Sequence, residues 1–244
     1  MKPEHLPLQW RQQSVSMHEA ATADLLAQEL AADVAEHLAS AVAARGRADL
    51  VVSGGSTPLP FFTALATAPI PWSNISVWLA DERWVASTHE DSNEALVRRS
   101  LLNGPAAAAT LHCMYVADSD PATAAAAYSQ RLRQRGDAFD VVVLGMGGDA
   151  HTASFFPDSP ELQQALVPAH SQLCVAVTTP SSPWTRLTLS LPCLLATARL
   201  YLHFTGTGKR QVLANALAAG NRTSTPVRNL FDQAGPQPVI WWAA

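Results

Sequence analysis

Residues 139–157, FDVVVLGMGGDAHTASFFP, join an apolar run to a glycine-rich segment that carries an acid and a histidine. The run Val141–Leu144 is short and rich in β-branched residues, which is typical of a strand buried on both faces of a parallel sheet. The glycines that follow permit a sharp turn. Because ligands of open α/β sheets bind beyond the carboxyl ends of the strands, this stretch predicts an α/β fold with a ligand site directly after the strand.

Asp149 and His151 lie two residues apart in this predicted loop. An imidazole has an ordinary pKa of about 6.5, so such a side chain can take up and return a proton near neutral pH. A neighbouring carboxylate can hold the ring in one tautomer. We therefore predict that His151 acts as a catalytic base and that Asp149 orients it. The alternative is a histidine that only forms a hydrogen bond within its own loop.

The letters GMGGDA also match the G-x-G-x-x-[GA] pattern of dinucleotide-binding folds. That pattern normally follows the first strand of a βαβ unit and opens a long helix. Here Pro157 and Pro160 interrupt any long helix. A dinucleotide site is therefore the less favoured interpretation of this loop.

A second candidate site follows the strand predicted at Asp49–Ser53. Hydroxyl groups, two glycines and the free N–H groups of a helix that begins at Pro58 are suited to hold an anion. A tight strand-to-helix turn is the alternative, but a turn does not require three hydroxyl groups. We predict a phosphate-binding loop that consists of Ser53, Gly54, Gly55, Ser56 and Thr57.

Charged residues also follow the strand predicted at Ile75–Ala80. Asp81, Glu82 and Arg83 come directly after it, at the edge where the ligand is expected. An ion pair between Asp81 and Arg83 is the alternative to a role in binding.

Lys209 lies in the segment Gly206–Lys209, between a predicted strand and a predicted helix. The chain has 16 Lys and Arg residues, of which only Lys2 and Lys209 are lysines. A lysine in the first turn of a helix faces the unfavourable end of the helix dipole unless an anion lies between them. We predict that Lys209 binds an anion, although GTGK lacks the spacing of a P-loop.

Helical and strand patterns alternate along the chain, which predicts a doubly wound, mostly parallel sheet flanked by helices. We expect an edge strand within residues 7–15 and a long amphipathic helix over His18–Ala44. A short helix or turn is expected from Thr152 to Phe156. The other predicted strands are 111–116, 173–178, 186–191, 199–205 and 239–242, and the other predicted helices are 121–135 and the segment from Lys209 to about Ala219.

The chain has 244 residues, of which 48% are hydrophobic and 15% charged, and we expect residues 1–244 to form one domain. The net charge of -4 argues against broad binding to nucleic acid. The three cysteines show no C-x-x-C spacing and are expected to be reduced core residues. Without an apolar leader or an 18-residue apolar span, we expect a cytoplasmic protein that does not enter the membrane.

Five motifs occur in an order and spacing that resemble those of the 6-phosphogluconolactonase family. They are SGGSTP at 53–58, DER at 81–83 with DSN at 91–93, GMGGDAHTASFFP at 145–157, RLTLSLP at 186–192 and TGTGK at 205–209. The resemblance implies a modified Rossmann-like sheet similar to that of glucosamine-6-phosphate deaminases and ribose-5-phosphate isomerases. It also implies hydrolysis of 6-phosphoglucono-δ-lactone to 6-phosphogluconate, in the oxidative pentose phosphate pathway, with no metal and no organic cofactor.

Chemistry and resemblance together favour direct attack of water on the lactone, with His151 as the base. Arg83 is expected to stabilise the oxyanion or to bind the phosphate, and Asp81 and Arg186 are expected among the substrate-binding residues. The resemblance also implies that the partner is a small-molecule phosphosugar lactone. We expect the protein to be a monomer or a homodimer. Ala150 stands where the family usually has glycine. We expect a negative φ there, because the chain from Thr152 onward is predicted to turn into a helix.

Two other functions remain as alternatives. An amino-sugar phosphate deaminase or isomerase would carry Asn-Glu-Pro after the histidine, whereas this chain has Phe155, Phe156 and Pro157. A phosphosugar-binding protein without turnover would keep the pocket and lack hydrolysis.

Overall fold

The computed structural model describes residues 8–10, 13–169, 172–219, 221–233 and 235–244. Its main sheet has seven strands in the order β3-β12-β11-β8-β4-β5-β7. All neighbouring strands in this sheet are parallel, which confirms the predicted sheet. The bounds of these strands are Met17–Ala20 (β3), Ala48–Val52 (β4), Ile75–Leu79 (β5), Thr110–His112 (β7), Phe139–Leu144 (β8), Thr197–Thr205 (β11) and Val239–Ala243 (β12).

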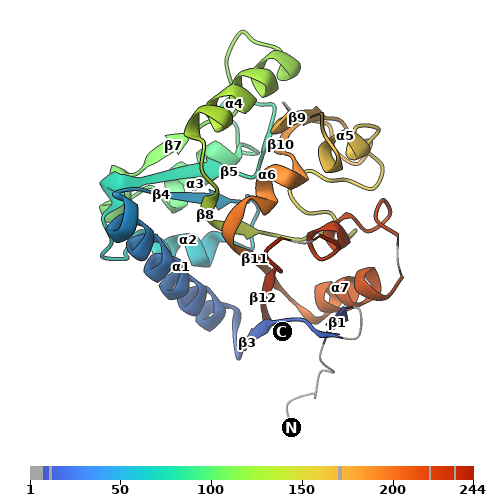
Figure 1. The fold of residues 1–244 in the computed structure, drawn as a ribbon, viewed down its shortest axis with the longest axis horizontal. Coiled ribbons are helices and arrows are strands. Elements are labelled where there is room, and N and C mark those ends of the chain that lie inside the picture. The colour runs from blue at the N-terminus through green and yellow to red at the C-terminus, as the bar shows by residue number, and fades with distance from the viewer. Residues whose placement is uncertain (1–7, 11–12, 170–171, 220, 234) are drawn as a thin grey trace.

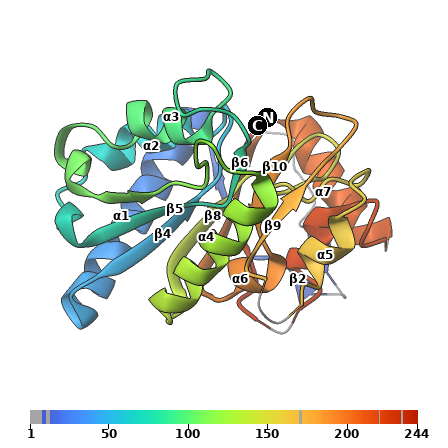
Figure 2. The ribbon, with the colours of Figure 1, turned by 90° about the horizontal axis from the view of Figure 1, so that it is seen from above.

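A smaller antiparallel sheet lies beside the main one, in the order β6-β10-β9 (Figure 2). The sequence pattern predicts β9 and β10, but it treats residues 81–83 as the end of a strand in the main sheet. The chain instead leaves β5 at Leu79 and enters a separate strand that pairs with β10. These strands are Asp81–Arg83 (β6), Cys174–Val177 (β9) and Arg186–Leu189 (β10).

Helices cover both faces of the main sheet (Figure 1). The helices α1 and α2 pack against each other on one side, and α1 contacts β3, β12, β8 and β4. The helices α4, α6 and α7 lie on the other side (Figure 1). The helix bounds are Ala23–Arg45 (α1), Leu59–Ala66 (α2), Asn93–Ser100 (α3), Pro121–Arg135 (α4), Leu162–Leu166 (α5), Leu191–Leu195 (α6) and Thr207–Ala219 (α7), with 3-10 turns at Trp72–Asn74 (η1), Gly104–Ala108 (η2) and Pro226–Leu230 (η3).

The beginning of the chain differs from the prediction. Residues 18–20 belong to β3, which is the edge strand of the main sheet, and α1 begins only at Ala23. The side chain of Thr22 caps this helix by accepting a hydrogen bond from the N–H of Leu25, and Gly46 ends it in the left-handed conformation. Within the predicted edge strand 7–15, Gln9–Trp10 (β1) pairs with Gln13–Ser14 (β2), and residues 7, 11 and 12 lie outside the described residues.

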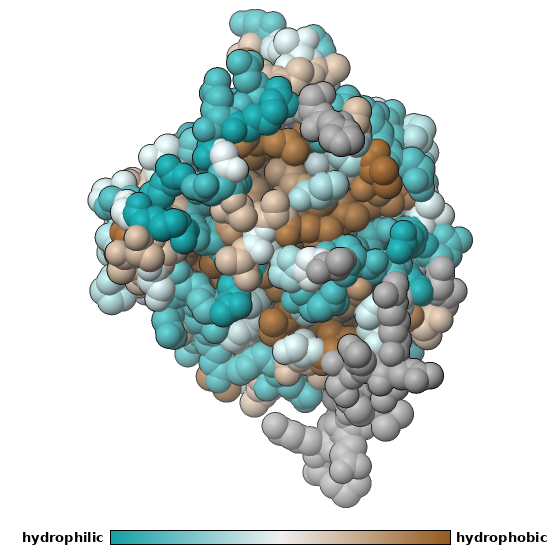
Figure 3. Space-filling model, viewed as in Figure 1, coloured by the Kyte–Doolittle hydropathy of each residue, from teal (hydrophilic) through white to brown (hydrophobic). Residues whose placement is uncertain are grey.

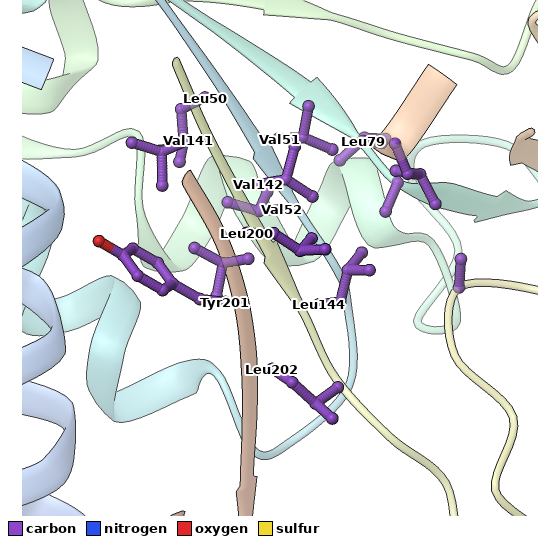
Figure 4. Packing of buried hydrophobic residues seen from close by; sticks show 14 of the residues in the cluster. Leu50, Val51, Val52, Leu79, Val141, Val142, Leu144, Leu200, Tyr201 and Leu202 are labelled. Atoms are coloured by element: carbon purple, nitrogen blue, oxygen red, sulfur yellow. The ribbon is translucent and has the colours of Figure 1, made fainter. Parts of the chain in front are cut away.

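The core is built on the central strands. Every residue of β4 and β8 is buried, as the apolar run of β8 predicts. Figure 4 shows their side chains packed with those of β5 and β11. The view in Figure 3 is hydrophilic around its periphery and carries apolar residues near its centre, around α6. The three cysteines are free, as predicted, and Cys113 is only half-buried.

The order of the strands determines where a ligand can bind. From β4 the chain moves outward to β5 and β7, and from β8 it moves in the opposite direction to β11 and β12. The neighbours β4 and β8 therefore flank the switch point of the sheet, where the two loops that follow them diverge and leave a crevice.

Candidate active site

A cavity of about 510 Å³ opens at this switch point. Its walls come from the loops after β4 and β8, from β6 and β10, and from the first turn of α7. All the residues that the sequence singles out as catalytic or substrate-binding line it, and their individual roles stay predictions. They are Ser53, Gly54, Gly55, Ser56, Thr57, Asp81, Arg83, Asp149, His151, Arg186 and Lys209.

The loop after β4 turns sharply into α2, which begins at Leu59 directly after Pro58. Gly55 has a φ of 97°, a conformation that side chains rarely adopt. Gly54 is required for another reason, because a Cβ atom there would lie 1.8 Å from Oδ1 of Asn93. The backbone of this loop therefore lies against α3, and its polar groups line the cavity.

Arg83 and Arg186 are brought together by the small sheet, which the sequence pattern does not show. They are directly opposite each other in the antiparallel pair β6 and β10, and both line the cavity. Burial lowers the pKa of Arg186, and the charge of Asp81 opposes that decrease. Like charges on opposite residues destabilise a sheet, so the pair favours a ligand that carries negative charge.

Asp81 is buried and is held by neutral groups. The hydroxyl of Ser154 donates a hydrogen bond to its Oδ2 at 2.6 Å, and Nδ2 of Asn93 donates to its backbone carbonyl at 2.8 Å. Ser154 belongs to the loop after β8. Asp81 therefore links this loop to β6, and the structure shows these contacts in place of the ion pair with Arg83.

Glu82 is fully buried, and no sequence pattern predicts a separate role for it. Its carboxylate accepts hydrogen bonds from the N–H groups of Arg83, Asn93 and Glu94, each at 2.7 Å, and from the hydroxyl of Ser92 at 3.2 Å. Burial raises its pKa to about 7, although the three N–H groups oppose the rise. Glu82 thus ties β6 to the first turn of α3 and holds the backbone at Arg83. The only signal in the sequence is the run of three charges.

Asp149 and His151 form the contact that the sequence predicts. Oδ1 of Asp149 lies 2.5 Å from Nδ1 of His151 and also accepts a hydrogen bond from the His151 N–H at 3.2 Å. Burial would raise the pKa of Asp149, but the hydrogen bonds and charge of His151 hold it below its ordinary value. A proton on Nδ1 leaves Nε2 as the ring nitrogen that can accept a proton.

The loop that carries this pair turns more tightly than predicted. The N–H of Gly147 donates to the carbonyl of His151 at 2.9 Å. Ala150, between the two functional side chains, has a φ of 65°, so the prediction of a negative φ is wrong. Within residues 152–156, where a short helix or turn is predicted, the structure has a turn at 153–154, and Ala153 also has a positive φ of 47°. The N–H of Ala150 donates to the carbonyl of Gly147 at 3.2 Å, so the left-handed residue lies inside the tight turn that joins Asp149 to His151.

Lys209 lies in the first turn of α7, at the edge of the same cavity. Its partial burial lowers its pKa. His203 of β11 also lines the cavity, although no sequence motif includes it. The only sequence signal for His203 is one polar residue within an apolar strand.

Comparison with known proteins assigns the chain to a family. A family model described as glucosamine-6-phosphate isomerases/6-phosphogluconolactonase matches residues 21–241. The chain belongs to this family. A 6-phosphogluconolactonase from Rhizobium meliloti is 41% identical over 230 residues, which cover 94% of this chain and 99% of the relative.

Solved structures agree with the fold. The crystal structure of a 6-phosphogluconolactonase from Shewanella baltica has a TM-score of 0.91 at 39% identity, covering 95% of this chain and 99% of that one. A monomeric glucosamine-6-phosphate deaminase has a TM-score of 0.75 at 18% identity, covering 94% of this chain and 97% of that one, and therefore shows a shared fold alone. In the part of the chain that the structure describes, no group of three or more His, Cys, Asp or Glu side chains is placed to hold a metal ion.

Proposed function

We infer that this protein is a 6-phosphogluconolactonase, which hydrolyses 6-phosphoglucono-δ-lactone to 6-phosphogluconate in the oxidative pentose phosphate pathway. The relatives that carry this name match nearly the whole chain. The observation that carries the chemistry is the 2.5 Å contact between Asp149 and His151 in a cavity that also holds three cationic side chains. Such a cavity suits an anionic substrate whose reaction needs one base.

The reaction follows from the orientation of His151. Nε2 takes a proton from water as the water oxygen bonds to the lactone carbonyl carbon, and the carbonyl oxygen becomes an oxyanion. The bond between that carbon and the ring oxygen then breaks, and the imidazolium returns the proton to the ring oxygen. Asp149 fixes the tautomer and stabilises the imidazolium while it exists.

Positive charge in the cavity has two tasks in this proposal, to bind the phosphate and to stabilise the oxyanion. We place the phosphate at Lys209 and the loop Ser53–Thr57, where a lysine, hydroxyl groups and backbone N–H groups are available. Arg83 and Arg186 lie on the small sheet and supply charge for either group. We assign to Asp81 the role of accepting a hydrogen bond from a sugar hydroxyl.

The region after His151 argues against deamination. Phe155 is fully buried, and the ring of Phe156 lies 4.6 Å from the ring of His151, measured between centroids. An apolar side chain therefore stands beside the base where the deaminase pattern places an acid. We also propose that the protein acts in the cytoplasm, because its substrate belongs to central carbohydrate metabolism. None of the described helices is long and apolar enough to cross a membrane.

A coupled assay on freshly generated 6-phosphogluconolactone, corrected for spontaneous opening, tests the function. We expect turnover by the wild type and a decrease in kcat of about 100-fold or more for His151→Asn, with product affinity largely retained. Binding of 6-phosphogluconate without any hydrolysis by the wild type would instead identify a phosphosugar-binding protein. Turnover near the wild-type level in His151→Asn would remove this residue from the mechanism.

A further inference from the structure

His203 is a polar exception in a buried strand. Its neighbours Leu202 and Phe204 on β11 are fully buried and apolar, as expected for a strand covered on both faces. The side chain of His203 is only 3% exposed, yet it lines the cavity. The small exposed part of the imidazole therefore faces the cavity.

The imidazole of His203 has no hydrogen-bond partner among the described residues. Its ring lies in an edge contact with the ring of Phe61, at 6.2 Å between centroids. Burial lowers its pKa to about 4, and the nearby charge of Lys209 lowers it further in the same direction. At neutral pH the ring is therefore uncharged, with one N–H donor and one acceptor nitrogen.

A buried polar group without a partner destabilises a protein, and a leucine would fill this position without that cost. The presence of histidine is explained if the missing partner is a ligand in the cavity. Lys209 provides the charge that selects the ligand, since an anion is attracted by the ammonium group and accepts a hydrogen bond from the imidazole. Ser53, at the end of β4, has a buried hydroxyl that also lacks a partner among the described residues, and it lines the same cavity.

We propose that His203 is a further phosphate-binding residue, which donates its ring N–H to a phosphate oxygen of the substrate beside Lys209. The proposal rests on the proposed function, because it extends the phosphate site assigned there to Lys209 and the loop Ser53–Thr57. A phosphate monoester has three terminal oxygens, so it can accept from the imidazole, the ammonium group and the loop at once. A neutral donor adds a hydrogen bond without placing a second cation beside Lys209.

Two variants separate this role from support of the fold. His203→Leu removes the donor, and His203→Gln keeps an N–H donor on a side chain of similar length. We expect His203→Leu to weaken binding of 6-phosphogluconate and of inorganic phosphate by about 10-fold or more, measured by calorimetry. KM should rise by a similar factor while kcat changes less than about threefold, and His203→Gln should recover most of the affinity.

The unfolding temperature without ligand distinguishes phosphate binding from support of the fold. If His203 supported the fold, His203→Leu would lower this temperature. His203→Leu should unfold at the same temperature as the wild type or higher, because it replaces an unpartnered polar group by an apolar one. Its stabilisation by 6-phosphogluconate should be smaller than that of the wild type. Unchanged affinity for both phosphate ligands, or a lower unfolding temperature with unchanged affinity, would overturn the proposal.

A measurement on the wild type covers the case in which His203→Leu does not fold. Inorganic phosphate should shift the imidazole nitrogen resonances of His203 in nuclear magnetic resonance spectra, with the assignment made from His203→Gln. Resonances that do not respond to saturating phosphate would place the phosphate elsewhere. These are binding measurements, so they are independent of lactone hydrolysis by the wild type, which tests the proposed function separately.

Discussion

Replacement of Gly147 by alanine tests whether the position of His151 limits the reaction. A Cβ atom on Gly147 would lie 2.2 Å from Cε1 and 2.3 Å from Nδ1 of His151, and 2.7 Å from Oδ1 of Asp149. The φ of Gly147 lies outside the left-handed region, so the backbone accepts alanine without strain. The substitution therefore acts on the two functional side chains and not on the turn itself.

The magnitude follows from these distances. Carbon atoms in contact are normally about 3.5 Å apart or more, so the imidazole must move by more than about 1 Å. A displacement of about 1 Å costs roughly 100-fold in rate, and loss of a general base costs about 100- to 10,000-fold. We expect Gly147→Ala to lower kcat by at least about 100-fold. The folded state should lose little stability, because a side chain that borders a cavity can rotate away.

Gly148→Ala is the matched control, since a Cβ atom at Gly148 meets no atom within 4 Å and its φ is also outside the left-handed region. Both variants are compared in the coupled lactone assay and by thermal unfolding. We expect Gly148→Ala to stay within about threefold of the wild-type kcat. If Gly147→Ala keeps wild-type kcat and unfolds normally, the ring can be displaced without consequence, and the assignment of His151 as the base is refuted.

Three further predictions concern the loop, the phosphate and pH. Ala150→Gly should raise the free energy of unfolding by up to about 1 kcal/mol and keep activity. Relief of the left-handed conformation stabilises the protein by about 1–2 kcal/mol, which exceeds the cost of about 0.8 kcal/mol for the loss of one buried methyl group. A clear decrease in the free energy of unfolding in denaturant titrations would contradict this. Lys209→Ala should weaken 6-phosphogluconate binding by about 10- to 150-fold, and it should reduce hydrolysis of the phosphorylated lactone far more than hydrolysis of gluconolactone. Equal losses of hydrolysis on the two lactones would instead place Lys209 at the carbonyl. The depressed pKa of His203, about 4, means that the unfolded chain takes up a proton near pH 6.5 while the folded protein without ligand does not. As pH falls from 6.5 to 4, this difference in proton uptake lowers the stability of the wild type by roughly 3 kcal/mol, whereas it has no effect above pH 6.5. His203→Leu should therefore lose less stability than the wild type over this range in denaturant titrations, and parallel curves would exclude a buried neutral histidine.

Local patterns predicted the elements that depend on nearby residues. The apolar run at 141–144 predicted a buried parallel strand, and Pro121–Arg135 is a helix with the predicted bounds. The contact between Asp149 and His151 was also predictable, because only Ala150 separates them in the chain. The φ of Ala150 was not predictable from the sequence, because the closure of the loop around Ala150 outweighs the preference of alanine for negative φ.

The sequence by itself determined the parallel α/β fold, the family and the set of polar residues that gather at one sheet edge. Periodicity and strand ends are local properties, and the carboxyl ends of parallel strands always meet on one side. Only the tertiary structure decided that Arg83 lies opposite Arg186, that Glu82 is buried against α3, and that His203 faces the cavity. These relations join residues far apart in the chain, and they depend on the pairing of β6 with β10 and on the position of β11 beside β8, which no local pattern encodes.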